Sequence, residues 1–176
     1  LRIVNDNNED LPNGEIGEVL VAGPGLCIGY NNPDLNKKVF EPDGWFHTGD
    51  LGIRDKEGSL IICGRKKDII IRSGENISAK EIEDLLHQHP SIKEAAVVAM
   101  PDEETGEKAC AYIILQPKKS FTFDDMTLHL SRFNLAKQKF PERIEIVDTF
   151  PRNAVGKVQK NLLRKDIEQK IKKNTN

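Results

Sequence analysis

The 176-residue sequence contains no long apolar run and no excess of charge of one sign. No apolar stretch approaches the roughly 20 residues that a helix needs to cross a bilayer, so we expect no membrane span. The first ten residues have neither a basic start nor an apolar centre, and no signal peptide is visible. The net charge is −2, with Lys and Arg scattered among Asp and Glu, which gives no reason to expect a nucleic-acid partner. These absences favour a cytoplasmic protein.

Cysteine and histidine are few and scattered. Three cysteines, Cys27, Cys63 and Cys110, are odd in number and lie far apart, each within an apolar stretch. This pattern favours reduced, buried thiols over disulfides or a metal site. The four histidines, at positions 47, 87, 89 and 129, show no ligand spacing. We therefore expect no metal site in this chain.

The first 65 residues show turn signals and short β-like runs. Glu57-Gly58 joins two such runs, residues 50–54 and 59–63, as a hairpin. No convincing helix is visible here, and the apolar content is too low to close a core alone. Because the chain also begins at Leu1 rather than Met, we expect a β-rich piece of a larger domain whose remainder lies upstream.

From residue 66 onward the pattern predicts a compact α+β domain. The expected order is helix, strand, strand, helix, strand, helix, with a three-stranded sheet. Ser78 with Glu81 and Thr122 with Asp125 mark the starts of two helices. The expected strands of this sheet cover residues 95–100, 109–115 and 143–147, and residues 68–72 are also strand-like.

The last predicted helix runs from residue 158 to about residue 172 and is amphipathic. Its expected inward-facing residues are Leu162, Leu163 and Ile167.

Three stretches combine glycines with charged residues. They are GWFHTGD at residues 44–50, GRKKDIIIRSGENI at residues 64–77 and PRNAVGKVQK at residues 151–160. A carboxylate such as Asp50 can accept two hydroxyl hydrogen bonds, as in ribose recognition. Lys157, on a loop before a helix, can supply a point charge to phosphate and carboxylate oxygens. Taken singly, each stretch is better interpreted as a turn, a charged hairpin or a surface lysine.

Taken together and in order, the three stretches resemble the adenylate-forming (AMP-binding) superfamily of acyl-CoA synthetases, peptide-synthetase adenylation domains and luciferases. The resemblance covers essentially the whole chain and is greatest to bacterial short- and medium-chain or cyclic-acid acyl-CoA synthetases. It implies an acid–thiol ligase (AMP-forming) that acts in fatty acid metabolism. Such an enzyme joins ATP and a small carboxylic acid into an acyl-adenylate, and CoA then displaces AMP to give the thioester.

The resemblance also implies two domains and five site residues. Residues 1–65 would end the large N-terminal adenylating domain, and residues 66–176 would be a mobile C-terminal lid that rotates between the half-reactions. The site positions, with the roles they have in the family, are Asp50 (ribose hydroxyls), Arg65 (ribose or phosphate region), Lys67 (hinge), Gly74 (wall of the CoA tunnel) and Lys157 (the catalytic lysine that bridges the carboxylate and the α-phosphate).

Two departures from the family pattern accompany these matches. Many relatives carry Lys-Thr-x-Ser-Gly before the last lysine, whereas this chain has RNAVG at residues 152–156, so the loop hydrogen bonds of the Thr and Ser are not carried over. Ile71 stands where some relatives have a second basic residue.

The phosphate loop, the Mg²⁺ ligands and the acyl pocket lie upstream in the family. We therefore expect this chain alone to be inactive, and its acyl substrate and oligomeric state are not readable. Two alternatives stay open: an aryl or acyl adenylation domain that loads a carrier protein, and a non-catalytic binding module.

Overall fold

The computed structural model describes residues 1–174. They form two compact units: unit 1 is Leu1–Lys67, and unit 2 begins at Asp68. The predicted boundary, between residues 65 and 66, lies two residues earlier along the chain. Within the described part of the chain, no helix is long and apolar enough to cross a bilayer.

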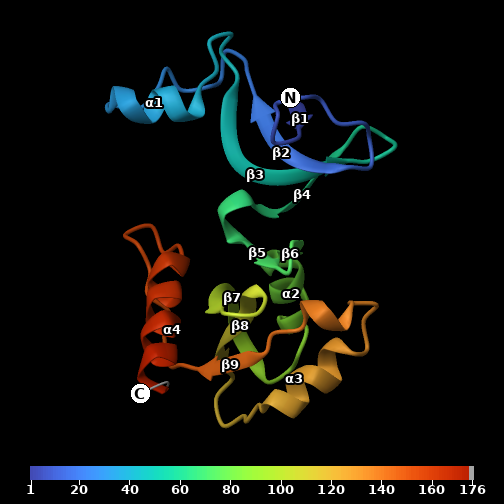
Figure 1. Cartoon of the computed structure of the whole chain (residues 1–176), viewed down its shortest axis with the longest axis vertical. Helices are drawn as coiled ribbons and strands as arrows, with labels where there is room; N and C mark the ends of the chain where they lie inside the picture. Colours follow the sequence, from blue (N-terminus) through green and yellow to red (C-terminus); the bar gives the residue numbers. More distant parts are fainter. Residues whose placement is uncertain (175–176) are drawn as a thin grey trace. The chain divides into compact units, whose positions relative to one another are not determined.

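Unit 1 is built on a four-stranded antiparallel sheet in the order β1-β2-β3-β4 (Figure 1). The strands are β1 (Arg2–Val4), β2 (Ile16–Val21), β3 (Phe46–Arg54) and β4 (Leu60–Arg65). The predicted hairpin is confirmed as β3–β4, and Gly58 supplies the positive φ of its turn (+86°).

Unit 1 also contains a helix that the sequence analysis did not predict, α1 (Pro33–Val39). Asn32 caps it by accepting a hydrogen bond from the Asp34 N–H at 3.0 Å, and Pro33 occupies the first turn. None of its residues is buried, so it has no apolar face to produce the helical periodicity. The Asn-Pro start was the available signal.

The core of unit 1 is small. Four apolar side chains are buried, namely Ile3, Val4, Val19 and Leu20. By contrast, Ile16 and Ile61 remain 59% and 52% exposed. Unit 1 therefore leaves much of its apolar surface uncovered within this chain.

Unit 2 contains a sheet of five strands rather than the three expected. The strands are β5 (Ile69–Arg72), β6 (Glu75–Ser78), β7 (Ile92–Asp102), β8 (Gly106–Leu115) and β9 (Arg143–Ile146). The order is β6-β5-β8-β7, and β9 pairs parallel to β8. The two added strands form a hairpin that joins the sheet through one pairing, Arg72 opposite Gly106. That pairing is long-range, so local patterns do not reveal it.

The three helices of unit 2 follow the predicted order and confirm the α+β class. They are α2 (Ala79–Leu86), α3 (Phe123–Leu130) and α4 (Lys160–Asn174). Ser78 caps α2 by accepting the Glu81 N–H, and Thr122 with Asp125 forms a reciprocal capping box on α3. Two short 3₁₀ turns, η1 (Lys66–Asp68) and η2 (Lys137–Lys139), complete the elements.

The central sheet of unit 2 is buried on both faces. Successive residues of β7 and β8 alternate between two apolar clusters, one on each face of the sheet. On one face, Val97 and Ala111 pack toward Ile82 of α2 and Met126 of α3. On the other face, Val98, Tyr112 and their neighbours pack toward Leu163 and Ile167 of α4. Figure 1 shows β7–β9 between these two helical layers. Double burial explains why both strands read as continuous apolar runs rather than alternating ones.

Two expectations about individual side chains are wrong. Leu162 is 40% exposed, because on α4 it lies one residue, and so about 100°, from the inward row of Leu163 and Ile167. Cys27 is exposed and Cys63 half-buried, so only Cys110 is the buried thiol expected of all three. None of the three, all within the described part of the chain, forms a disulfide.

Candidate functional site

Asp50 and Arg65 face each other across the β3–β4 hairpin. Their Cα atoms are register partners, and Arg65 Nε lies 2.6 Å from Asp50 Oδ1. The side chains are 31% and 39% exposed, so the pair is accessible to a ligand. Asp50 lies within β3, in the β-like run predicted for residues 50–54, and not in the turn that its stretch suggested when taken singly. The hairpin thus brings together the two residues predicted to bind the nucleotide.

A short hydrogen-bonded chain fixes the backbone beside Asp50. The Thr48 hydroxyl donates to the Val19 carbonyl at 2.7 Å and accepts the Asp50 N–H at 3.0 Å. Gly49 between them has φ +69°, a conformation that favours glycine. Residues 48–50 are therefore held by a hydrogen bond to β2 as well as by the pairing of their own strand, β3.

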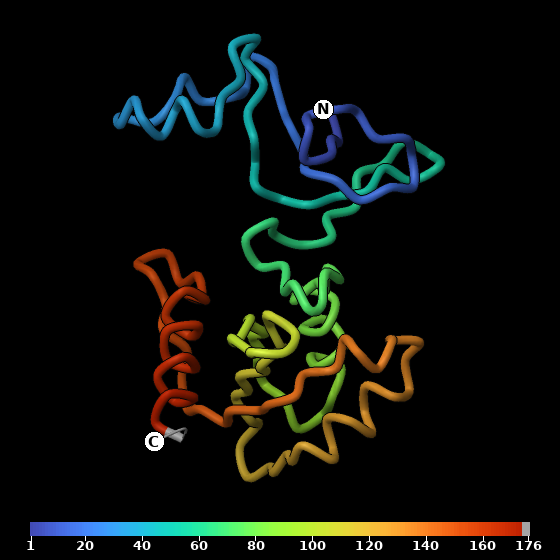
Figure 2. Tube along the Cα trace, in the orientation of Figure 1, coloured from blue at the N-terminus to red at the C-terminus, as the bar shows by residue number. Residues whose placement is uncertain are grey.

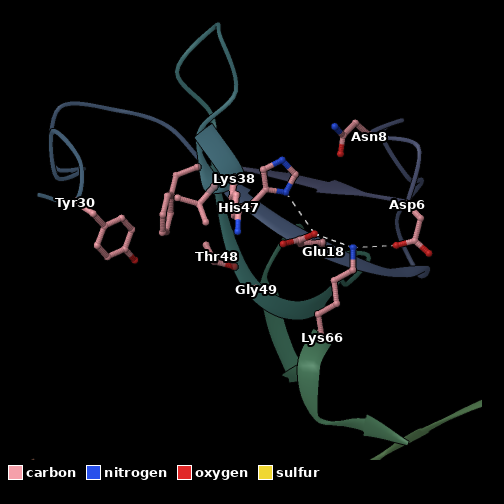
Figure 3. Close-up of a pocket in the computed structure, with 11 residues that line it drawn as sticks. Asp6, Asn8, Glu18, Tyr30, Lys38, His47, Thr48, Gly49 and Lys66 are labelled. Carbon is pink, nitrogen blue, oxygen red and sulfur yellow. Dashed lines mark hydrogen bonds and ion pairs between the residues drawn. The ribbon is translucent and has the colours of Figure 1, made fainter. Parts of the chain in front are cut away.

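A second ionic cluster in unit 1 was not predicted from the sequence. Glu18 of β2 is buried. Its Oε2 atom accepts a hydrogen bond from Lys66 Nζ at 3.1 Å and lies 3.4 Å from His47 Nδ1. Lys66 also pairs with Asp6 at 2.9 Å, and this contact together with Glu18 raises the pKa of the Lys66 ammonium. Figure 3 shows the Asp6–Lys66–Glu18–His47 chain. The sequence signal was a lone Glu inside an apolar strand, which needs a buried partner.

These residues border a cavity of about 480 Å³ that lies wholly in unit 1. Its wall includes His47, Thr48 and Gly49 of β3, the residues immediately before Asp50, with Tyr30 on another side (Figure 3). The wall carries both carboxylate and ammonium groups. The cavity therefore adjoins the segment that the sequence analysis singled out, although Asp50 itself is not part of its lining.

Lys67, the predicted hinge residue, is exposed and is the middle residue of η1. Its neighbours are each tied to their own unit. Lys66 binds Glu18 and Asp6 of unit 1, whereas Asp68 forms an ion pair with Arg164 of α4 and lies 3.9 Å from Lys160 Nζ. The boundary between the units falls between Lys67 and Asp68.

Gly74 lies in the two-residue turn of the β5–β6 hairpin. Its φ is +83°, and the preceding Ser73 also has a positive φ of +48°. A Cβ atom on Gly74 would meet nothing within 4 Å, so the backbone conformation, not close packing, requires glycine here. The residue belongs to unit 2, as does Lys157, but it comes from a different loop.

Lys157 is exposed and lies in the loop that precedes α4. The chain runs beside α4, reverses in this loop and returns as the helix (Figure 2). Backbone hydrogen bonds close the reversal: Gln159 N–H donates to the Pro151 carbonyl at 2.8 Å, and Asn153 N–H donates to the Lys157 carbonyl at 3.0 Å. The loop is therefore an ordered turn that presents the lysine side chain outward.

Comparison with known proteins identifies the group to which these features belong. Residues 81–157 match the family described as the AMP-binding enzyme C-terminal domain. The chain belongs to the adenylate-forming, AMP-binding superfamily. This agrees with the resemblance drawn from the three glycine-containing stretches.

Individual relatives place the chain among ligases of this superfamily. It is 44% identical over 173 residues to the medium-chain fatty-acid–CoA ligase of Escherichia coli (strain K12), covering 97% of this chain and 31% of that protein. It is 37% identical over 175 residues to the 2,3-dihydroxybenzoate–AMP ligase of Bacillus subtilis (strain 168), covering 97% and 32%. The crystal structure of ATP-bound MatB from Rhodopseudomonas palustris matches with a TM-score of 0.87 at 37% identity, covering 95% and 33%.

The chain spans about a third of the length of the superfamily members that it matches. Asp50, Arg65, Lys67, Gly74 and Lys157 all lie within the aligned length, but the matches do not assign roles to them.

Proposed function

We propose that this chain is the C-terminal part of an ATP-dependent acyl-CoA synthetase that forms an acyl-adenylate and then an acyl-CoA thioester. The observation that carries the proposal is the Asp50–Arg65 pair, held opposite each other on β3 and β4 in a chain whose relatives are named as CoA and AMP ligases. Unit 1 would supply part of the nucleotide site and unit 2 would supply the lid.

The chemistry of the pair suits a nucleotide. Arg65 Nε contacts Asp50 Oδ1, and a carboxylate has a second oxygen that can accept hydrogen bonds from ribose hydroxyls. The guanidinium keeps further N–H donors for a ribose or phosphate oxygen. Both side chains are partly exposed, as an approaching ligand requires.

The uncovered apolar surface of unit 1 supports a place inside a larger domain. With four buried apolar side chains, the unit gains little hydrophobic stabilisation within this chain. We infer that Ile16, Ile61 and their neighbours pack against the remainder of an adenylating domain. That remainder would also contribute the acyl pocket, the phosphate loop and the Mg²⁺ ligands, so this chain alone would not turn over.

Lys67 is proposed as the pivot between domain orientations. The ion pairs of Lys66 and Asp68 hold the two sides of η1 to different units, so a rotation of one unit must be taken up by the torsions between them. In one orientation Lys157 would enter the adenylation site, and in the other the Gly74 hairpin would border the CoA path.

Lys157 is proposed to act only in the first half-reaction. Its ammonium would stabilise the charge that develops between the attacking carboxylate and the α-phosphate of ATP. It is exposed on an ordered loop, which fits a group that must reach a site completed by the rest of the enzyme.

The carrier-protein alternative uses the same first half-reaction and differs only in the acceptor. The similarity to the 2,3-dihydroxybenzoate–AMP ligase keeps it relevant. Supplying the full-length enzyme with CoA or with a phosphopantetheine-bearing carrier protein, and measuring thioester formation, distinguishes the two acceptors.

The deciding experiment is Lys157→Ala in the full-length enzyme, with the half-reactions measured separately. We expect adenylate formation, followed as pyrophosphate release, to fall about 100- to 1,000-fold, as for the loss of one charge-stabilising donor. Conversion of a supplied acyl-adenylate and CoA to the thioester should hardly change. Lys165→Ala, which removes an exposed lysine further along α4, is the matched control and should leave both steps unchanged. Normal adenylation by Lys157→Ala refutes the assignment.

A further inference from the structure

We propose that Asn153 and Arg152 are positioning residues that set the backbone of Lys157 for adenylation. The inference rests on the proposed role of Lys157 and concerns how the loop holds that residue before substrate arrives.

Asn153 engages both backbone polar groups of Lys157. Its side-chain oxygen Oδ1 accepts the Lys157 N–H at 2.8 Å and the Val155 N–H at 3.2 Å. Its own backbone N–H donates to the Lys157 carbonyl at 3.0 Å. One residue therefore fixes the peptide groups on both sides of the Lys157 Cα atom, while the lysine side chain stays exposed.

Arg152 ties the same loop to the central sheet of unit 2. Its Nη1 donates to the Gly156 carbonyl at 2.9 Å, and its Nη2 forms an ion pair with Glu94 of β7. Gly156 adopts φ +81° and donates its N–H to the Asn153 carbonyl at 2.9 Å. The turn that carries Lys157 is thus linked through one guanidinium to a strand of the rigid sheet.

This arrangement accounts for the departure from the family's Thr and Ser pattern. Asn153 stands where many relatives have Thr, and Val155, 85% exposed, stands where they have Ser. The amide oxygen of Asn153 makes two loop hydrogen bonds by itself, so a hydroxyl at position 155 is not needed to close the turn. A valine without a hydroxyl can therefore occupy position 155.

The functional consequence is preorganisation. A lysine whose backbone is already fixed loses less conformational entropy when its ammonium group enters the site. Misplacement of a catalytic group by about 1 Å can lower the rate about 100-fold. Asn153→Leu, which keeps the approximate side-chain size but removes the acceptor, should therefore slow adenylation by about 10- to 100-fold in the full-length enzyme. Asn153→Asp retains the acceptor oxygen and should recover most of the rate. Thioester formation from supplied acyl-adenylate should be unchanged in both variants.

Arg152→Met and Glu94→Gln test the tie to the sheet. Both should slow adenylation less than Asn153→Leu does, because the Asn153 hydrogen bonds remain. The double variant should be no slower than Arg152→Met alone, since either change breaks the same ion pair. Additive losses would show that the two residues act independently and would overturn this part of the proposal.

A double-mutant cycle with Lys157→Ala separates failure of this inference from failure of the proposed function. If Asn153 acts only by positioning Lys157, Asn153→Leu should slow the wild type but not the Lys157→Ala variant. A normal rate for Lys157→Ala rejects the catalytic role itself. A slow Lys157→Ala with a normal Asn153→Leu rejects only the positioning role, as does an equal effect of Asn153→Leu in both backgrounds.

Amide hydrogen exchange gives a readout that does not depend on activity. In the wild type, the Val155 and Lys157 amides should be protected, and Asn153→Leu should increase their exchange while the amides of β7 and β8 keep theirs. Loss of protection throughout unit 2 would indicate that Asn153→Leu misfolds. The test would then be made on Asn153→Asp, which keeps the acceptor oxygen and should keep the Val155 and Lys157 amides protected. Unchanged exchange at Val155 and Lys157 in Asn153→Leu would contradict the geometry on which the proposal depends.

Discussion

The hydroxyl of Tyr112 offers a quantitative test of how α4, the helix that follows the Lys157 loop, is attached to the sheet. Tyr112 of β8 is buried at 1% exposure, and its hydroxyl lies 2.6 Å from Asp166 Oδ2 and 3.2 Å from the Leu163 carbonyl. Lys170 contacts the same carboxylate at 2.8 Å. Tyr112→Phe removes the hydroxyl while keeping the ring in place.

The size of the effect follows from the charge and exposure of the acceptor. A hydrogen bond to a charged group contributes about 1.5–3 kcal/mol to stability. Asp166 is 46% exposed, so solvent screens the interaction, and it keeps Lys170 in the variant. We therefore expect Tyr112→Phe to lower the free energy of unfolding of unit 2 by about 1–1.5 kcal/mol near pH 7.

The same interaction predicts a pH dependence. Lys170 and then Tyr112 hold the pKa of Asp166 below its ordinary value of 3.8. A carboxyl group with a lowered folded-state pKa stabilises the fold above its unfolded-state pKa, and this stabilisation is lost as the pH falls through the folded-state pKa. The difference between wild type and Tyr112→Phe should therefore be full above about pH 5 and shrink below about pH 4.

The assay is urea unfolding followed by far-ultraviolet circular dichroism, with hydrogen exchange of the α4 amides to assign the loss to this helix. Tyr30→Phe is the matched control, because Tyr30 lies in unit 1 and is 49% exposed. It should leave the stability of unit 2 unchanged. Equal stability of Tyr112→Phe and the wild type would contradict this prediction, as would a difference in stability that stays constant from about pH 7 to pH 3.

Two further predictions concern the linker and the thiols. Lys67→Pro in the full-length enzyme should leave adenylation largely intact and strongly impair thioester formation, because proline fixes φ near −65° at the proposed pivot; equal loss or equal retention of the two measured half-reactions would contradict it. Burial raises the pKa of the Cys110 thiol from 9.0 to about 12. At about pH 8 the thiolate fraction of Cys110 is therefore about 1,000-fold smaller than that of a thiol with the ordinary pKa. Iodoacetamide should therefore modify exposed Cys27 far faster than Cys110, as measured by mass spectrometry, and similar rates would be inconsistent with a buried thiol.

Unit 2 was largely predictable because its signals are local. The Thr122–Asp125 pair caps α3 as expected, and Ser78 caps α2. The apolar runs at residues 95–100 and 109–115 are both strands. What the sequence could not provide was the attachment of the β5–β6 hairpin, since a single long-range pairing makes it part of the sheet.

Unit 1 was less predictable because its stabilising contacts join distant residues. Lys66 and Glu18 are 48 positions apart, and neither belongs to a motif that implies the other. Helix α1 buries none of its residues, so only its Asn32-Pro33 start could have revealed it. Where burial is slight, periodicity carries little information.

The Asp50–Arg65 pair shows how one irregularity decides the geometry of a site. Near the turn, Arg54 faces Leu60 and Gly52 faces Ile62, and continuing that register would place Gly64 opposite Asp50. A bulge between Leu51 and Gly52 shifts the pairing by one residue and places Arg65 there instead. Because side chains alternate with a period of two, this single step decides whether the arginine shares a face with the carboxylate or lies on the other side of the sheet. The hairpin could be predicted from its turn and its apolar runs, but the bulge could not. The resemblance nevertheless selected both residues, because a sequence motif preserves the spacing that already includes the extra residue.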